Sequence, residues 1–469
     1  MNNILVASNR GPVSYTCSEQ GELTVRRGSG GLVSGLSDTS GDDLLWVCAA
    51  MSEADRQAAR GARKGRLDPA GHGRLRMLDL PPATFDRAYN GVANSTLWFV
   101  HHLLYDTPVS PRFDAAFRRE WAAYRDYNEA FASALAEEAA PEARVLVQDY
   151  HLTLVPAMLR SARPDLRVAH FSHTPWAPPE YFSLLPDDVA AQVLGGILGA
   201  EHAGFLTARW ARAFTDCCAN LLGAQTDGRG VTLGGRTTRL GVHSLGVDGE
   251  ALWRRAHEPD VETCLAALRE QVGDRRLIVR IDRAELSKNI VRGLAAYREF
   301  LAAHPEWHGR VVHLVFAYPS RHDLPGYRAY TAAVRQAAEE IRHEYGTADW
   351  DPLVLDLADD YPRSLAAYRL ADVLVVNPVR DGMNLVAKEG PVLSRRCALV
   401  LSREAGAAAE LGADALVVNP YDVLETARAL RMALEMPEDE RLRRGARLAT
   451  AATSLPPRRW LAAQLTALT

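Results

Sequence analysis

Short apolar runs rich in β-branched residues alternate along this chain with longer segments of helical periodicity, and this alternation restricts the possible folds most strongly. The runs cover residues 4–8, 145–148, 168–172, 277–281, 311–317, 354–357, 373–377 and 398–401. Such alternation is typical of parallel sheets wound with helices. Many of the runs are apolar on both faces, as expected where helices cover each side of a sheet. The sequence therefore predicts an α/β fold with parallel sheets.

The length of the chain predicts more than one domain. Its 469 residues exceed what a single hydrophobic core normally organises. A Gly-Val-Asp-Gly stretch at 246–249, followed by one charged helical segment over 250–271, marks the expected crossing between domains. We expect domains over 1–246 and 247–454, with a C-terminal helix over 455–469 that packs back on the first domain. Two such domains facing each other leave a cleft at the carboxyl ends of their strands, where open α/β sheets bind ligands.

Composition and charge exclude several classes of function. The chain is 47% hydrophobic and 24% charged, with no run long enough to cross a bilayer and no secretory signal, so we expect a cytoplasmic protein without membrane partners. A net charge of −4 provides no basic field for nucleic acid, so an anion must be bound locally. The six cysteines lack CxxC and Cys/His spacings, so we expect neither a disulfide framework nor a metal site. No cofactor is expected.

Lysine is rare in this chain, which uses arginine at almost every basic position. Of 54 basic residues, three are lysine: Lys64, Lys288 and Lys388. A lysine kept in such a background indicates a need for a compact ammonium group rather than a planar guanidinium. The alternative is survival by chance.

Three segments carry residues suited to binding phosphate groups. The loop 26–32 contains Gly30 and Gly31 before a helical segment, where backbone N–H groups can approach an anion, although a purely structural turn is an equal alternative. Arg283 and Lys288 follow the run 277–281 and suit a diphosphate leaving group, the alternative being a solvated charged loop. The segment 378–390 follows the run 373–377 and turns from strand into helix, as expected of an anion site.

Seven motifs in order carry a family resemblance: SNR at 8–10, SGGL at 29–32, YNGVANSTLW at 89–98, QDYHL at 148–152, HTPWAPPEYF at 173–182, DRAELSKN at 282–289 and RDGMNLVAKE at 380–389. Together they resemble the trehalose-6-phosphate synthases, retaining enzymes of glycosyltransferase family 20 with the GT-B fold. The resemblance implies two Rossmann-like domains facing across a cleft. It also implies glucose transfer from GDP-glucose or UDP-glucose to glucose 6-phosphate without a metal, and it leaves association into a homo-oligomer open.

The resemblance assigns roles to individual residues, which we group by ligand. The expected catalytic set comprises Asp149, His173, Arg283, Lys288 and Asp381. The donor is expected to contact Gly30, Gly31, Arg283, Lys288, Asp381, Gly382, Met383, Asn384, Leu385 and Glu389, with Glu389 on the ribose and Asp381 and His173 on the glucose hydroxyls. The acceptor is expected to contact Arg10, Tyr89, Trp98, Asp149 and Arg321.

Each of these residues also has a structural interpretation. Tyr89 and Trp98 are compatible with core aromatics, His173 with a buried core histidine, and Asp149 with a turn former. We expect these four side chains in loops that follow strands, which favours the functional interpretation.

Three departures from the family pattern bear on the ligands, and the first of them concerns a contact to the acceptor. A second tryptophan is missing from the stretch after Trp46, which reads Val-Cys48-Ala-Ala; Asn289 replaces a more usual glycine; and the segment 316–321 is altered near the expected nucleobase pocket. These variants resemble a branch that uses GDP-glucose, so GDP-glucose is favoured over UDP-glucose.

The resemblance favours a front-face mechanism over a double displacement, which would need a carboxylate nucleophile. Two rival functions are a pseudo-glycosyltransferase that joins cyclitol units, and a catalytically silent subunit that senses a sugar phosphate.

Overall fold

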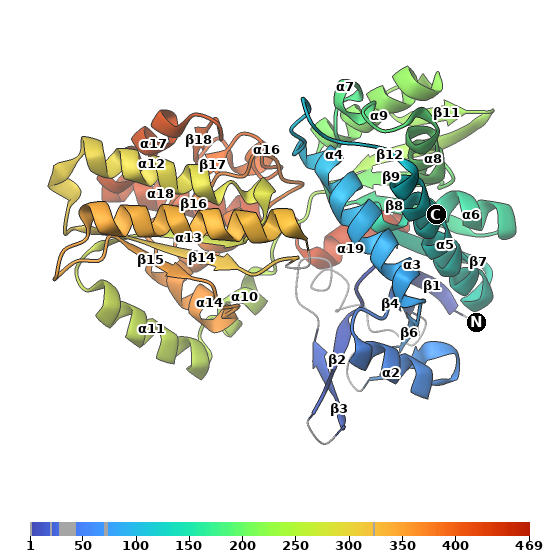
Figure 1. Ribbon diagram of the computed structural model, residues 1–469, viewed down its shortest axis with the longest axis horizontal. Helices are drawn as coiled ribbons and strands as arrows, with labels where there is room; N and C mark the ends of the chain where they lie inside the picture. The colour runs from blue at the N-terminus through green and yellow to red at the C-terminus, as the bar shows by residue number, and fades with distance from the viewer. Residues whose placement is uncertain (1, 19–20, 28–43, 70–73, 322–323) are drawn as a thin grey trace. The chain divides into compact units, whose positions relative to one another are not determined.

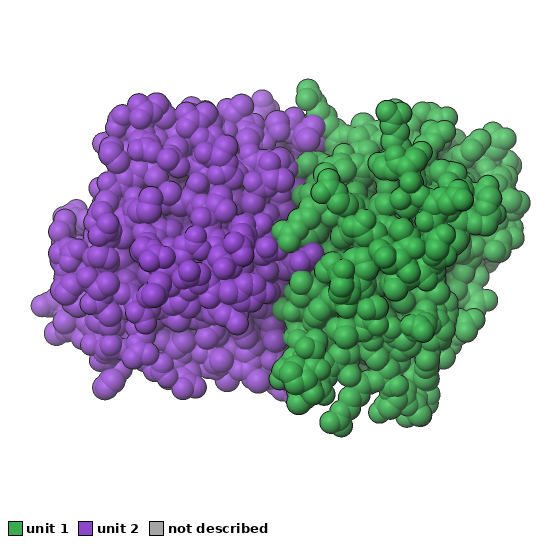
Figure 2. Space-filling view, turned by 90° about the horizontal axis from the view of Figure 1, so that it is seen from above, with its two compact units in different colours: residues 1–244, 457–469 green, residues 245–456 purple. Residues whose placement is uncertain are grey.

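The computed structural model describes residues 2–18, 21–27, 44–69, 74–321 and 324–469. These form two compact units, coloured separately in Figure 2. Unit 1 comprises Met1–Ser244 with Pro457–Thr469, and unit 2 comprises Leu245–Pro456. The boundaries lie two residues from those expected at 246 and 454.

Unit 1 is built on a ten-stranded sheet, counted over the described residues, in the order β10-β11-β12-β9-β8-β7-β1-β4-β6-β5. The neighbours from β12 to β6 pair in parallel, whereas β5, β10 and β11 pair antiparallel at the two edges. A separate hairpin pairs β2 with β3. The strands are β1 Asn2–Ala7, β2 Val13–Cys17, β3 Leu23–Arg27, β4 Leu44–Ala49, β5 Arg66–Leu67, β6 Arg74–Leu78, β7 Ala139–Gln148, β8 Arg167–Ser172, β9 His202–Phe205, β10 Gln225–Thr226, β11 Gly230–Leu233 and β12 Arg236–Val242.

Helices of unit 1 connect these strands (Figure 1). They are α2 Glu53–Gly61, η2 Arg63–Gly65, α3 Pro82–Asp86, the π-helix η3 Arg87–Leu97, α4 Trp98–His102, α5 Ala115–Glu138, η4 Tyr150–Leu152, α6 Val155–Ala162, α7 Pro179–Phe182, α8 Asp187–Ile197, α9 Ala208–Leu222 and α19 Pro457–Thr466. The last of these, α19, is the expected C-terminal helix. Its Trp460 is 1% exposed and meets the Phe171 ring edge-on at 5.0 Å, so the helix packs into the core of unit 1.

Unit 2 is a six-stranded parallel sheet in the order β15-β14-β13-β16-β17-β18. Its strands are β13 Arg276–Arg283, β14 Val311–Tyr318, β15 Leu353–Asp356, β16 Val373–Val376, β17 Ala398–Ser402 and β18 Leu416–Val418. Its helices are α10 Gly249–Arg255, α11 Pro259–Val272, η5 Leu286–Lys288, α12 Ile290–Ala303, η6 Pro305–Trp307, α13 Pro325–Tyr345, α14 Tyr361–Leu370, α15 Val386–Leu393, α16 Ala408–Leu411, α17 Val423–Glu435 and α18 Glu438–Thr453. Residues along β16 and β17 are buried throughout, so both faces of this sheet are covered.

All eight apolar runs form strands, and the α/β fold with parallel sheets is confirmed. The single helix expected over 250–271 is wrong, because the chain forms α10 and then α11. Pro259 occupies the first turn of α11, where its missing N–H costs nothing, whereas inside a continuous helix it would remove a hydrogen bond.

Candidate active site

Asp149 and His173 follow neighbouring parallel strands of unit 1, β7 and β8, and lie together at the carboxyl edge of its sheet. The His173 backbone N–H donates to Asp149 Oδ1 at 3.1 Å. Asp149 has φ 73° and ψ 175°, a backbone conformation that is essentially restricted to glycine. Strain of this kind persists where the surrounding structure fixes it, and it concentrates at functional sites.

Neighbouring side chains fix both the position and the protonation state of His173. Its Nε2 lies 2.9 Å from Gln148 Oε1, and Gln148 Nε2 in turn donates to Gln464 Oε1 of α19 at 3.3 Å. Burial lowers the pKa of His173 to about 3, so its imidazole is neutral at physiological pH. With Gln148 in this orientation, His173 Nε2–H is the donor, which leaves Nδ1 as a hydrogen-bond acceptor.

Arg10 and Tyr89 of unit 1 are also adjacent. Arg10 follows β1 and is exposed, and its Nη2 donates to the Tyr89 hydroxyl at 3.4 Å. The Tyr89 ring stacks on His151 at 5.7 Å, and Trp98 meets Tyr150 at the same centroid distance. Tyr150 and His151 directly follow Asp149. Five of the predicted site residues lie in the described part of unit 1, and Arg10, Tyr89, Trp98, Asp149 and His173 form one connected cluster.

The expected loop location holds for Asp149 and His173 but is wrong for Tyr89 and Trp98. Tyr89 lies in the π-helix η3, and Trp98 begins α4, which continues from it without a break. π-Helical turns widen the helix and occur frequently at functional sites. The two aromatic residues are therefore held on a helix rather than on a loop.

We expect Asp149→Gly to unfold at a higher temperature than Asp149→Asn, although both lose activity. Both changes remove the carboxylate, but only glycine removes the backbone strain, which is worth about 1–3 kcal/mol before the entropic cost of glycine. Thermal melting of the two purified variants checks this. An Asp149→Asn protein that melts at the higher temperature, or an Asp149→Gly protein with wild-type turnover, would contradict it.

In unit 2, Arg283 ends β13 and Lys288 ends the short helix η5 that follows it. Arg283 is 51% exposed along its side chain, and its Nη1 lies 3.1 Å from Glu285 Oε1. Lys288 is largely buried, and its Nζ lies 2.6 Å from Asp381 Oδ2. Burial alone would lower the pKa of Lys288, but Asp381 and other nearby carboxylates raise it above its ordinary value. Both groups therefore carry positive charge at the carboxyl end of the strand.

Arg321 belongs to the same cluster in unit 2. Its Nη1 donates to the Tyr327 hydroxyl at 2.6 Å and lies 3.7 Å from Glu285 Oε1. Burial alone would raise the pKa of Glu285, but Arg283 and Arg321 lower it to about 2. Glu285 is fully buried, yet the two arginines keep it ionised, and they share it as a counter-ion.

The segment after β16 forms a long loop, and helix α15 begins only at Val386, within the segment 378–390 that was expected to turn from strand into helix. Backbone hydrogen bonds fix this loop: Asp381 N donates to Glu404 O, Gly406 N to Asp381 O, and Ala407 N to Met383 O. A Cβ on Gly406 would lie 1.9 Å from Gly382 O, so only glycine permits this approach. The loop places Asp381 against Lys288.

Asn384 closes the loop and starts the helix. It has φ 76°, its Oδ1 accepts from Ala387 N at 3.1 Å, and its Nδ2 donates to Asp381 Oδ2 at 3.1 Å. Leu385 is the N-cap residue of α15, so the N–H groups expected to face an anion do lie at a helix N-terminus.

Glu389, in the first turn of α15, is held by a residue that sequence reasoning missed. Its Oε2 accepts from the Tyr368 hydroxyl at 3.0 Å, and burial raises the pKa of its carboxyl group. Tyr368 lies on α14, and no sequence signal connects it with Glu389. Glu285 and Gln148 were missed too, although both lie inside the quoted motifs and each is a buried polar residue next to a predicted site residue.

Packing accounts for two of the departures from the family pattern. Asn289 has φ 61°, a left-handed conformation that asparagine tolerates better than most residues, and its Nδ2 donates to Asn377 O and Pro420 O at 2.9 and 2.8 Å. Cys48 is buried in β4, and a Cβ on Gly11 would meet its Sγ at 2.6 Å. Trp46 Nε1 donates to Ser8 Oγ at 2.7 Å. Gly30 and Gly31 lie outside the described residues.

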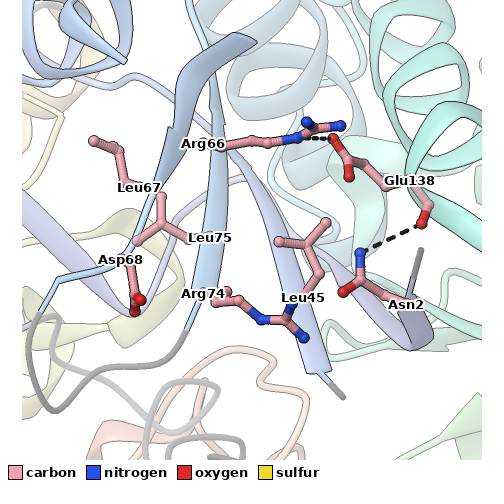
Figure 3. Close-up of a pocket in the computed structure, with 8 residues that line it drawn as sticks. All are labelled: Asn2, Leu45, Arg66, Leu67, Asp68, Arg74, Leu75 and Glu138. Carbon is pink, nitrogen blue, oxygen red and sulfur yellow. Dashed lines mark hydrogen bonds and ion pairs between the residues drawn. The ribbon is translucent and has the colours of Figure 1, made fainter. Parts of the chain in front are cut away.

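Unit 1 also contains a cavity of about 310 Å³, whose lining includes none of these residues; Figure 3 shows its lining side chains. It opens at the amino ends of β1, β4 and β6, whereas the site residues follow carboxyl ends. An ion pair closes one side, with Arg66 Nε 2.7 Å from Glu138 Oε1. We assign it no role in the reaction. Its lining residues are Asn2, Leu45, Arg66, Leu67, Asp68, Arg74, Leu75 and Glu138.

Within the described part of the chain, no group of three or more His, Cys, Asp or Glu side chains is arranged to hold a metal ion. No helix in that part combines the length and apolar character needed to cross a bilayer.

The family model described as glycosyltransferase family 20 matches residues 2–469. The chain belongs to glycosyltransferase family 20. The resemblance seen in the seven motifs is thereby confirmed, and with it the expectation of a glycosyltransferase.

Curated relatives of this family 20 chain are named for trehalose phosphate synthesis. It is 35% identical to a bifunctional trehalose-6-phosphate synthase/phosphatase of Thermoproteus tenax over 94% of the chain, and spans 60% of that relative's length. It is 34% identical to a UDP-forming alpha,alpha-trehalose-phosphate synthase of Aspergillus fumigatus, over 94% of the chain and 91% of the relative.

Solved structures confirm the GT-B fold of the family 20 chain. A UDP-forming alpha,alpha-trehalose-phosphate synthase from Burkholderia xenovorans in complex with glucose-6-phosphate gives a TM-score of 0.87 at 26% identity, covering 100% of each chain. A structure titled as trehalose-6-phosphate from E. coli bound with UDP-2-fluoro glucose gives 0.85 at 27% identity, covering 99% of this chain and 98% of that chain.

Buried histidines make the stability of this family 20 protein sensitive to acid. Burial lowers the pKa of His170 and His202 to about 4 and that of His313 to about 3. The unfolded chain takes up protons near pH 6.5, whereas the folded chain does not, so the stability present above pH 6.5 is lost as the pH falls towards 4. We expect the free energy of unfolding to fall by about 2 kcal/mol per histidine between pH 7 and 5. Melting temperatures across this range check it, and an unchanged value at pH 5 would contradict it.

Proposed function

We propose that this family 20 chain is an alpha,alpha-trehalose-phosphate synthase. It transfers glucose from a nucleoside diphosphate glucose to glucose 6-phosphate with retention of configuration. One observation carries this proposal: two cations, Arg283 and Lys288, stand at the carboxyl end of β13 next to the fixed Asp381 loop. The names of the relatives, and the glucose-6-phosphate in the Burkholderia xenovorans complex, support the choice of reaction.

The proposed donor residues lie in unit 2, apart from His173 and the Gly30–Gly31 backbone. Arg283 and Lys288 bind the diphosphate together with N–H groups at Gly382, Met383, Asn384 and Leu385. A guanidinium can bind phosphate oxygens bidentately, whereas an ammonium supplies a point charge. Glu389 accepts the ribose hydroxyls, and Asp381 and His173 bind hydroxyls of the glucose.

The proposed acceptor residues are those of the unit 1 cluster other than His173, together with Arg321 of unit 2. Arg10, Tyr89 and Trp98 bind the 6-phosphate together with Arg321 of unit 2. Guanidinium, phenol and indole groups together provide a dense set of donors for a phosphate dianion. Asp149 accepts a hydrogen bond from the acceptor sugar.

The proposed mechanism is a front-face displacement without a metal. The bond from the anomeric carbon to the diphosphate oxygen breaks, and a new bond forms to the acceptor hydroxyl oxygen on the same face. The hydroxyl proton passes to the departing phosphate oxygen. Arg283 and Lys288 stabilise the negative charge that grows on that phosphate, and each such contact is worth about a hundredfold or more in rate.

The identity of the donor nucleotide is the most specific part of the proposal. Packing explains Asn289 and Cys48, so these two departures no longer favour guanine. The Aspergillus fumigatus relative is named as UDP-forming, and the E. coli structure contains a UDP sugar. We therefore propose UDP-glucose as the first donor to test, with GDP-glucose as the alternative. The relatives' names weigh against cyclitol coupling.

Nucleotide release tests the proposal directly. The purified chain is incubated with UDP-, GDP- or ADP-glucose, with and without glucose 6-phosphate, and the released diphosphate is measured. We expect release that depends on glucose 6-phosphate and yields trehalose 6-phosphate. A chain that releases nothing with any donor would instead be a silent sugar-phosphate sensor, and a chain active only with a cyclitol nucleotide would be a pseudo-glycosyltransferase.

A further inference from the structure

Glu285 is a buried carboxylate that the proposed reaction does not use. Its side chain is 0% exposed, and it lies between the end of β13 and helix η5. Burying an ionised carboxylate costs several kcal/mol unless charges and hydrogen bonds compensate it. The chain therefore keeps a costly group at this position, and its contacts indicate what it does.

Among the described residues, the side-chain hydrogen bond and the two arginine ion pairs of Glu285 all involve one oxygen. Arg283 Nη1 lies 3.1 Å from Oε1, Arg321 Nη1 lies 3.7 Å from it, and Ser320 Oγ donates to it at 2.8 Å. The other oxygen, Oε2, is buried and has no hydrogen-bond partner among the described residues. One arginine thus pairs closely with the carboxylate and the other more loosely, while a second anionic oxygen stays available to either.

The two arginines serve different ligands in the proposed function, on which this inference rests. Arg283 binds the donor diphosphate, whereas Arg321 binds the phosphate of the acceptor. When an anion draws one guanidinium away from Glu285, the ion pair between the carboxylate and the other guanidinium changes in strength. A shared counter-ion therefore links the two ligands energetically, and such coupling acts equally in both directions.

We propose that Glu285 is a positioning residue that orients both phosphate-binding arginines and couples donor binding to acceptor binding. It also ties the loop together through its backbone, because Lys288 N donates to Glu285 O at 3.0 Å. The Tyr327 hydroxyl accepts from the same Arg321 Nη1 that faces Glu285, so Glu285 and Tyr327 together hold that end of the guanidinium. Neither residue contacts a substrate in this account.

The test compares Glu285→Gln with a matched control. Asp372→Asn removes a carboxylate of the same kind, which bridges Arg276 and Arg441 of unit 2 at 2.6 and 3.3 Å but lies at the amino end of β16. For each protein we would measure kcat, both KM values, and the Kd of UDP and of glucose 6-phosphate by calorimetry. The Kd of glucose 6-phosphate is measured again with saturating UDP.

We expect Glu285→Gln to lower kcat about tenfold or more, since the arginines lose their alignment in the transition state. The Kd of UDP should change less than about threefold, because the two positive charges remain. The effect of UDP on glucose 6-phosphate affinity should shrink by about threefold or more, whereas Asp372→Asn keeps both the coupling and kcat.

Other results overturn the proposal. A Glu285→Gln enzyme with wild-type kcat and coupling shows that the carboxylate positions nothing. If Glu285→Gln and Asp372→Asn both lose binding of UDP and glucose 6-phosphate and both melt at a lower temperature, the role of Glu285 is purely structural. If Glu285→Gln does not fold, Ser320→Ala removes one hydrogen bond to the same oxygen and must weaken the coupling in the same direction. The calorimetry decides this question even if no donor is turned over, an outcome that would contradict the proposed function instead.

Discussion

Arg283→Ala is expected to lower kcat about a hundredfold or more while leaving the protein folded. The guanidinium stands at the end of β13, where it meets the charge that develops on the leaving diphosphate. Half of its side chain is exposed, but it pairs with the buried Glu285, so the melting temperature should fall; Arg321 and Ser320 still contact that carboxylate, and the protein should stay folded. Steady-state kinetics and thermal melting of the purified variant measure the two effects separately.

Arg298→Ala is the matched control for this prediction. Arg298 is 48% exposed and lies 2.6 Å from Glu344, so it resembles Arg283 in exposure and in pairing with a carboxylate. It lies on α12, away from the carboxyl end of β13. The control should keep wild-type kcat. An Arg283→Ala enzyme that also kept it would remove Arg283 from the mechanism.

Lys288→Met is expected to damage both activity and stability. The ammonium lies 2.6 Å from Asp381 in a largely buried position, so removing it breaks a buried ion pair. Breaking a buried ion pair in this way costs about 3–5 kcal/mol. Activity should fall about a hundredfold to a thousandfold, because the donor loses a charge and the Asp381 loop loses its anchor.

The double variant Lys288→Met/Asp381→Asn separates the two effects. The double variant also removes the negative charge of Asp381, so the melting temperature should recover towards that of the wild type, but activity should not return. Chemical denaturation and nucleotide release measure these outcomes. Recovery of activity in the double variant would show that Lys288 serves only to neutralise Asp381.

The sequence predicted the strands and their carboxyl-end residues well, because this information is local. Apolar runs identified eight strands, and Arg283 and Lys288 could be placed at the end of one of them. The helical segment that carries Tyr89 and Trp98 was assigned to loops, since a π-helix has no simple periodicity to recognise. The shortest strands, β5, β10 and β18, have too few residues to stand out from buried helix segments.

Long-range contacts explain what the sequence could not show. Gln464 reaches Gln148 across 316 positions, and Tyr368 reaches Glu389 from another helix. The backbone strain at Asp149 depends on the fold around it, and an aspartate in the sequence does not predict it. The same applies to Glu285, whose role depends on bringing together Arg283 and Arg321 from two neighbouring strands.

The proposed donor site can be tested with a structure of the protein bound to UDP-glucose, or to UDP and glucose 6-phosphate. We predict that the β-phosphate oxygens lie within hydrogen-bond distance of Arg283 and Lys288, with the ribose against Glu389. A nucleotide bound elsewhere, with both cations directed into solvent, would contradict it.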